Sequence, residues 1–194
     1  MGAVSPSSGD ISEPVSQNTL RITKVLWALD SSLANSRHFP AINWINSYSL
    51  YINQLDIWYK RNVGNDWPVL RNKIMEILQK EDEINEIVQL VGYESLPEGD
   101  KLILDIAKII REDFLQQNAF DEVDQYSSID RQYKILSLIN KLYSVEDKLI
   151  KSNKKLTDIN TDDIKKERYT KEDKLDQKLE KISKMIMELL NYGN

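Results

Sequence analysis

Apolar residues recur at every third or fourth position along most of the chain, which is the spacing at which a helix buries one face. Strand-like alternation of apolar and polar residues is almost absent. The pattern therefore predicts an all-α protein, a helical bundle of about five to six helices. Their apolar stripes span residues 22–33, 48–59, 70–91, 95–116, 135–149 and 175–189.

The breaks between these stripes carry residues that start or end helices. The segment RHFPAINW (residues 37–44) ends the first stripe, and Gly92 is a natural stop for the third. Ser95 and Glu98 have the spacing of a capping box, and Pro97 between them is tolerated in a first helical turn. We therefore expect the fourth helix to begin at this point.

Composition divides the chain into three parts. We expect an extended segment over residues 1–16, the helical bundle over residues 17–152, and a charged linker with a terminal helix packed on the bundle over residues 153–194. Of the 37 residues from Val145 to Lys181, 21 are charged in near balance, which is typical of a solvated surface. The alternative is that the terminal helix packs on another chain.

Composition also limits the classes of function. The 194 residues include no cysteine, which excludes thiolate sites and favours a reduced, intracellular setting. No apolar run approaches the roughly 20 residues that a membrane-spanning helix needs. The net charge of −5 is concentrated between Glu76 and Asp124, where there are 14 acidic and 4 basic residues. This segment disfavours nucleic acid as a partner; it is either a solvated acidic helix pair or the counterpart of a basic protein surface.

The sequence shows no catalytic centre of its own. It contains no GxxxxGK[ST] phosphate loop, no GxGxxG and no HExxH, and a single histidine, His38, excludes a multi-histidine metal site. Adjacent acidic pairs such as Asp82 and Glu83 point apart on a helix, so we predict no catalytic residue and no metal site. An enzyme centred on His38 is the least favoured hypothesis. A free-standing helical adaptor that binds through residues 175–189 is a stronger alternative.

Two phenylalanines lie at breaks between predicted helices. Phe39 belongs to RHFPAINW, where we expect Trp44 to pack into the bundle, and Phe120 belongs to the polar connector QQNAFDEVDQYSS. A flat aromatic ring at such a place either plugs the end of a bundle or serves as a platform for a flat ligand. The residues alone leave both alternatives open.

Longer stretches of the sequence resemble a known family. GDISEPVSQNTLRITKVLWALDSSLANSRHFPAINWINSYSLY, EILQKEDEINEIVQLVGYESLPEGDKLIL and REDFLQQNAFDEVDQY follow in unbroken order within residues 3–145. They resemble the C-terminal domain of the catalytic A subunit (alpha chain) of archaeal-type and vacuolar-type rotary ATPases, which translocate protons. The resemblance implies a helical bundle beneath a nucleotide-binding α/β domain, of which a short extended segment would precede the bundle here.

The same resemblance implies that the chemistry lies elsewhere in the subunit. The phosphate loop, the catalytic glutamate and the metal-binding elements of the family would lie upstream, and Met1 before GAVSPSSGD suggests a cut inside a strand of the parent domain. We therefore expect ATP or ADP with Mg²⁺ in the intact subunit, and neither nucleotide binding nor activity in the isolated fragment.

The resemblance also implies an adenine pocket. Phe39 stands where the family stacks an aromatic ring on the adenine, and Phe120 stands where a second aromatic ring closes the pocket from the bundle side. Gln117 and Asn118 neighbour Phe120 and are candidates for reaching the purine edge.

A second implied site is a contact with the rotor. YESLPEGDK (residues 93–101) resembles the acidic tip that related F-type beta subunits write as DELSEEDK, although Pro97 and Gly99 replace acidic positions. The implied rotor contacts are Glu94, Leu96, Pro97, Glu98 and Asp100 in this tip, with Asp10 and Glu13 in the loop SSGDISEP. The implied partners are the B subunits of the hexameric head and the central stalk, on the cytoplasmic face of the membrane, with no nucleic acid and no membrane insertion.

Overall fold

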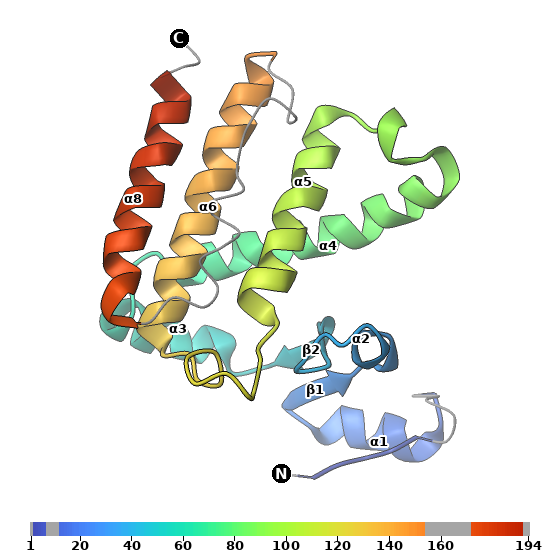
Figure 1. Cartoon of the computed structure of the whole chain (residues 1–194). Coiled ribbons are helices and arrows are strands. Elements are labelled where there is room, and N and C mark those ends of the chain that lie inside the picture. Colours follow the sequence, from blue (N-terminus) through green and yellow to red (C-terminus); the bar gives the residue numbers. More distant parts are fainter. Residues whose placement is uncertain (1, 7–11, 154–171, 192–194) are drawn as a thin grey trace.

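A computed structural model describes residues 2–6, 12–153 and 172–191 (Figure 1). The described part is mostly helical, which confirms the predicted class, and it adds one small antiparallel sheet of two strands. Asp10 and most of the predicted charged linker lie outside the described residues. Within the described part, no helix is long and apolar enough to cross a membrane.

Within the described residues, four long helices form the bundle. They are α4 (Trp67–Val91), α5 (Glu98–Ile109), α6 (Ile129–Lys151) and α8 (Glu172–Asn191). Helices α5, α6 and α8 lie side by side, and α4 crosses behind α5 and α6 (Figure 1). All four contribute aliphatic side chains to one core, among them Leu78, Leu102, Ile106, Leu142 and Ile186. The apolar stripes of the third, fourth, fifth and last predicted helices are therefore the faces that meet in this core.

The third predicted helix ends where its sequence indicates. Gly92 follows α4 with a φ of 81°, a backbone conformation that favours glycine, and its N–H donates to the carbonyl of Val88. The short 3₁₀ helix η2 (Tyr93–Ser95) then turns the chain toward α5.

The predicted capping box at the start of α5 is wrong. The N-cap residue is Pro97, whose ψ of 148° is extended, because Ser95 is already used in the turn of η2. Glu98 is therefore the first helical residue, and its carboxylate accepts a hydrogen bond from Nζ of Lys101 at 3.0 Å. The helical run reaches Leu115, close to the predicted end near Gln116, but its last turns form the π-helical segment η3 (Ile110–Leu115).

The first two predicted helices are wrong in part. The segment contains α1 (Pro14–Ile22), β1 (Val25–Leu29), α2 (Ser31–Asn35), β2 (Ile42–Ser49) and α3 (Ile52–Asn62). Strand β1 pairs antiparallel with β2, with Leu26 opposite Tyr48 and Leu29 opposite Ile42. A short apolar run fits a strand as well as a helix, and here the pairing with β2, distant in sequence, decides between them.

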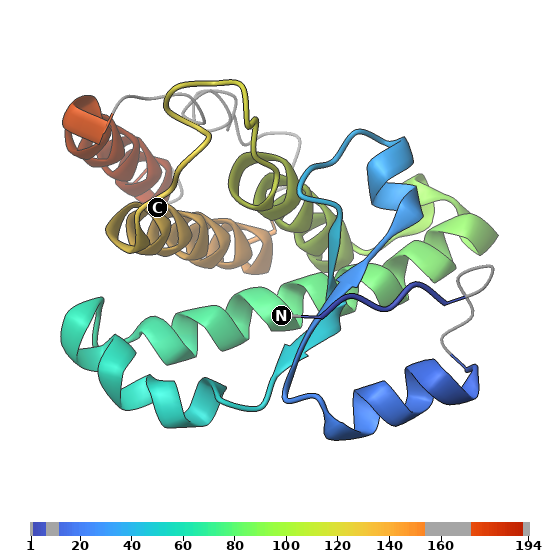
Figure 2. The ribbon, with the colours of Figure 1, turned by 90° about the horizontal axis from the view of Figure 1, so that it is seen from below.

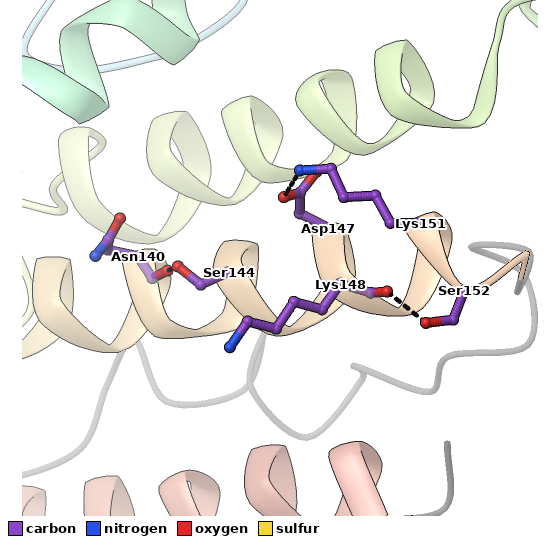
Figure 3. Close-up of polar contacts among 6 residues, drawn as sticks. All are labelled: Asn140, Ser144, Asp147, Lys148, Lys151 and Ser152. Atoms are coloured by element: carbon purple, nitrogen blue, oxygen red, sulfur yellow. Dashed lines mark hydrogen bonds and ion pairs between the residues drawn. The ribbon is translucent and has the colours of Figure 1, made fainter. Parts of the chain in front are cut away.

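A serine side chain forms a hydrogen bond with the backbone at each end of α6. At the start, Oγ of Ser128 accepts the backbone N–H of Arg131 at 3.1 Å, which is an N-cap. At the end, Oγ of Ser152 donates to the carbonyl of Lys148 at 3.0 Å, and Lys151 pairs with Asp147 at 2.6 Å (Figure 3). Nearer the middle of the helix, Ser144 donates to the carbonyl of Asn140 (Figure 3).

Helix α8 packs along α6. Ile182 and Ile186 are buried in the common core, and Lys134 of α6 pairs with Asp176 of α8 at 2.9 Å. Lys141 of α6 also donates to Oγ of Ser183. The bundle therefore covers the part of the apolar face of α8 that carries Ile182 and Ile186.

Candidate functional site

Two loops that lie far apart in sequence meet beside the strand pair β1 and β2. One joins α2 to β2 and carries Phe39; the other follows η3 and carries Phe120. The backbone N–H of Gln117 donates to the carbonyl of Phe39 at 2.6 Å, and the side-chain amide of Gln116 donates to the carbonyl of Arg37 at 3.2 Å. The loop after α5 lies on the side of the segment that joins α2 to β2 (Figures 1 and 2). The fold therefore brings together the two loops that carry the predicted aromatic residues.

Asp30 shapes the first loop. Its carboxylate accepts hydrogen bonds from the backbone N–H of Ser32 at 2.8 Å, from Oγ of Ser32 at 2.6 Å and from Nδ2 of Asn43 at 2.8 Å. These hydrogen bonds lower the pKa of Asp30 to about 2; the largest effect comes from Oγ of Ser32, followed by the amide of Asn43 and then the N–H of Ser32. The backbone N–H of Asp30 also donates to the carbonyl of Ala41, so the loop is closed at its base.

Within this loop the histidine is buried and the phenylalanine is exposed. The ring centroid of His38 lies 5.6 Å from that of Trp44, and Trp44 packs against the core as predicted. Phe39, joined to Pro40 by a cis peptide bond, is 51% exposed. The geometry therefore assigns His38 to packing and leaves the ring of Phe39 open to a ligand.

The second loop is held by a carboxylate and an amide. Asp124 is buried, and its Oδ2 accepts the backbone N–H of Asn118 at 2.7 Å. Oδ1 of Asn118 in turn accepts the N–H of Phe120 at 3.0 Å, an Asx turn that presents the following ring. The side chain of Phe120 is 100% exposed. A fully exposed phenylalanine ring contributes no stabilisation through burial. Its position on a well-bonded turn therefore indicates a surface that contacts a ligand or a partner.

Further bonds tie this turn to α6. Oδ1 of Asp121 accepts the backbone N–H groups of Val123 and Asp124, each at 2.9 Å. Arg131, buried near the start of α6, donates from its guanidinium to the carbonyl of Val123 at 3.1 Å. The bonds of Asp121 stabilise the turn itself, and the bond from Arg131 connects it to a long helix of the core, so Phe120 is presented from a fixed support.

Gln117 and Asn118, the two residues predicted to reach the purine edge, differ in exposure and in their hydrogen bonds. Gln117 is half-buried and uses its backbone N–H to join the two loops. Asn118 is exposed, but its side-chain oxygen is engaged by Phe120. Gln117 therefore lies at the junction of the two loops, and Asn118 chiefly shapes the turn.

The predicted rotor contacts in residues 93–101 lie at the opposite end of α5 from the two loops (Figure 1). Tyr93 is 44% exposed and Glu94 and Pro97 are exposed, whereas Leu96 is buried. Lys101 pairs with Glu98 at 3.0 Å and lies 5.8 Å from the ring centroid of Tyr93. This tip is thus an exposed aromatic and acidic surface on a buried leucine anchor.

Two other predicted contacts lie at the starts of helices. Asp100 is half-buried in the first turn of α5. Glu13 occupies the N-cap position of α1 and accepts a hydrogen bond from Oγ of Ser16 at 3.1 Å.

The sequence analysis missed a buried ion pair. Glu81 of α4 is 5% exposed, and its Oε1 lies 2.9 Å from Nη2 of Arg111 in η3. Burial raises the pKa of Glu81, and the neighbouring Arg111 offsets part of that shift. The position of Glu81 inside the apolar stripe of α4 was the one sign of this pair in the sequence. No spacing rule links residue 81 to residue 111, so its partner could not be predicted.

The described residues contain no group of three or more histidine, cysteine, aspartate or glutamate side chains placed to hold a metal ion. The two loops offer exposed aromatic surface, and the carboxylates of Asp121 and Asp124 in the second loop accept backbone N–H groups. The exposed aromatic surface suits a flat ring system.

Comparisons with known proteins match two separate parts of the chain. Residues 56–159 match the family described as the C-terminal domain of V and A type ATP synthase. Residues 1–49 match the nucleotide-binding domain of the ATP synthase alpha/beta family. Phe39 therefore falls within the match to the nucleotide-binding domain, and Phe120 within the match to the C-terminal domain.

Individual relatives show the same similarity. The A subunit of the A-type ATP synthase from Methanosphaera stadtmanae is 49% identical over 195 residues, which cover 98% of this chain and 33% of that protein. The V-type ATP synthase alpha chain of Clostridium botulinum (strain Okra) is 48% identical over 200 residues, covering 100% and 34%. The chain thus spans about a third of the length of these relatives.

A solved structure has a similar fold. The ATP synthase subunit NeqB from Nanoarcheaum equitans superposes with a TM-score of 0.59 at 22% identity, over 71% of this chain and 32% of that one. At this identity the likeness concerns the fold alone.

Proposed function

This chain belongs to the family of C-terminal domains of V- and A-type ATP synthases, and from that premise we propose that it completes the adenine pocket of a catalytic subunit. We further propose that it transmits nucleotide-dependent motion to a central rotor. The intact subunit would bind ATP or ADP with Mg²⁺ and belong to a rotary proton-translocating complex at the cytoplasmic face of a membrane. Its partners would be the B subunits of the head and the central stalk.

The observation that carries the adenine role is the junction of the two loops. The hydrogen bond from Gln117 to the carbonyl of Phe39 joins a segment similar to a nucleotide-binding domain to a segment similar to the C-terminal domain. Each segment carries an exposed phenylalanine in its loop. A purine that stacks on Phe39 and Phe120 would therefore contact both parts of the catalytic chain simultaneously.

Stacking suits such a divided site. An aromatic ring that stacks on a base contributes about 1–3 kcal/mol and needs no particular hydrogen-bond pattern. The phosphates and Mg²⁺ would be held by other residues of the subunit, because the described residues offer no acidic cluster for the metal. This chain would then supply affinity and orientation for the base, and no residue of the reaction itself.

Replacing the fully exposed aromatic ring tests this role. Phe120→Ala in the complete subunit should weaken binding of ADP and ATP by roughly five- to 150-fold, the equivalent of one lost stacking contact. Fluorescence titration with a labelled nucleotide gives the affinity. Tyr126→Ala is the matched control, since Tyr126 is an exposed aromatic residue of the same loop. Equal affinity of Phe120→Ala and the control would refute the adenine role.

The rotor role has separate support. Tyr93, Glu94 and Pro97 form an exposed turn on a continuous helix hairpin, within a strongly acidic part of the chain that would suit a basic partner. Glu98, Asp100 and Glu13 would add acidic contacts, although Glu98 is already paired with Lys101. Leu96 is buried, so we assign it to anchoring the turn.

The free-standing adaptor is less well supported. That hypothesis needs an open apolar face on the last helix, yet Ile182 and Ile186 are buried in the bundle core.

A further inference from the structure

The buried pair of Glu81 and Arg111 plays no part in the adenine contacts proposed above. Glu81 is almost fully buried in α4, and Arg111, one-third exposed, is 2.9 Å away in η3. Burying a carboxylate is costly even when it is paired, and apolar residues of similar size often do as well for stability. Stability alone therefore gives a weak reason for this pair, which leaves a role in positioning.

A second feature of this region is the helix type at Arg111. Segment η3 continues directly from α5 but has π-helical turns, and its closing bond runs from the N–H of Gln116 to the carbonyl of Arg111 at 2.9 Å. Single π-helical turns are rare in proteins, and those that occur are often found at functional sites. Arg111 thus bonds to α4 through its side chain and to Gln116 through its backbone.

Gln116 and Gln117 connect this segment to the first site loop. The side chain of Gln116 donates to the carbonyl of Arg37, and the backbone of Gln117 donates to the carbonyl of Phe39. A continuous series of contacts therefore runs from Glu81 through Arg111 and Gln116 to the loop of Phe39. Glu81 also lies on the helix that leads to the tip, ten residues or about 15 Å from its last residue, Val91.

We propose that Glu81 and Arg111 are positioning residues: their ion pair holds η3 in its π-helical form against α4 and so keeps Gln116 and Gln117 in register with the Phe39 loop. A π-helical turn contains an extra residue. If η3 relaxed to an α-helix, the residues after it would rotate by about 100° around the helix axis and lose their bonds to the Phe39 loop. The consequence for nucleotide binding rests on the adenine role proposed above.

Hydrogen exchange on the 194-residue chain tests the positioning step without any nucleotide. The test variant is the double substitution Glu81→Met with Arg111→Met, which removes both charges and leaves no unpaired buried carboxylate. Site-resolved NMR should show the amides of Gln116 and Gln117 exchanging at least about fivefold faster, because their bonds open more often. Lys108→Met, an exposed charge at the end of α5, is the control.

Two results of this exchange experiment would overturn the proposal. One is exchange at Gln116 and Gln117 equal to that of the Lys108→Met control. The other is the same acceleration at Leu142 in the middle of α6, because the pair would then support the whole bundle and not this segment. Acceleration confined to the loop supports the proposal.

Nucleotide affinity in the complete subunit tests the functional step. We expect the double variant to weaken ADP binding by about three- to tenfold, as a loop bond is lost. If Phe120→Ala weakens binding and the double variant does not, the positioning role for nucleotide binding is wrong. If Phe120→Ala itself has no effect, the adenine role fails, and the exchange experiment still decides whether the pair positions the loop.

Discussion

At the scale of single residues, short polar side chains decide the shape of both site loops. Asp30 holds the base of the Phe39 loop through Ser32 and Asn43, and Asp124 holds the Phe120 turn through Asn118. Carboxylates suit this task because they accept several N–H or O–H groups at once and strengthen each bond by their charge. The aromatic residues can then be exposed without the loops losing their conformation.

The pKa of Asp30 gives a direct check on the first loop. We expect a carboxyl titration followed by NMR to give a pKa of about 2. Because the folded-state pKa lies below the value of 3.8 for the unfolded chain, the stabilisation from Asp30 is complete above pH 3.8 and disappears as the pH falls through 2. An unshifted pKa would mean that the loop is not closed in solution.

Substitution of Asp30 separates its charge from its capping role. Asp30→Ala should cost about 1 kcal/mol of local stability at pH 7, read from amide exchange in α2, since alanine cannot cap a helix. Asp30→Asn is the matched control: it keeps an oxygen for the N–H of Ser32, so it should cost less and remove the loss of stability in acid.

At the scale of elements, α4 and α5 form a helical hairpin, and the turn between them, which includes η2, is exposed. Helix α4 ends at Gly92, Leu96 is buried, and Tyr93 and Glu94 are exposed. Because the anchor and the exposed residues lie so close together in the chain, the turn can meet a partner without unfolding. Shortening the turn would remove the anchor as well, so single exposed substitutions are the better test.

Charge reversal in the turn tests the rotor contact. Glu94→Lys in the complete complex should weaken binding of the central stalk by roughly two- to fivefold at low salt, as expected for an exposed charge contact of up to about 1 kcal/mol. The effect should shrink at high salt because exposed charges are screened. The affinity can be measured by surface plasmon resonance.

Glu76→Lys is the control for this charge reversal. Glu76 is an exposed acid of α4, 15 residues or about 23 Å from Val91 along the helix. If both variants weakened binding equally, the overall acidic charge and not the turn would be responsible.

At the scale of the whole molecule, one bundle supports both candidate surfaces. The two site loops lie at one end of α5 and the exposed turn lies at the other (Figure 1). Helix α8 packs along α6 and completes the core with Ile182 and Ile186. A bundle packed in this way can move as a unit, which is what transmission between two distant surfaces requires.

Truncation of Ile186 tests whether α8 belongs to the core. Ile186→Ala should lower the free energy of unfolding by about 2–5 kcal/mol, because the residue is fully buried and leaves a cavity. Met187→Ala, at the exposed neighbouring position, should change it by less than about 0.5 kcal/mol. Urea unfolding monitored by circular dichroism gives both values. Similar small effects would contradict the packing of α8 on α6 and revive an adaptor that binds through this helix.

The sequence was most informative where a pattern is long. Helices α4, α6 and α8 follow from apolar periodicity, and α4 ends at Gly92 because that backbone conformation favours glycine. Prediction failed for short elements: the run Val25–Leu29 fits a strand or a helix, and only its pairing with β2 decides. The roles of Phe39 and Phe120 came from resemblance to a family, not from the pattern itself.

What the sequence determined by itself is therefore the helical class, the long helices and the family, because these depend on repeated local patterns and on extended similarity. Only the tertiary structure decided that Gln117 joins the Phe39 and Phe120 loops and that Glu81 meets Arg111. Each of these contacts joins residues far apart in the sequence. No spacing rule connects such residues. The packing of α4, α5 and the strand pair β1 and β2 brings them together.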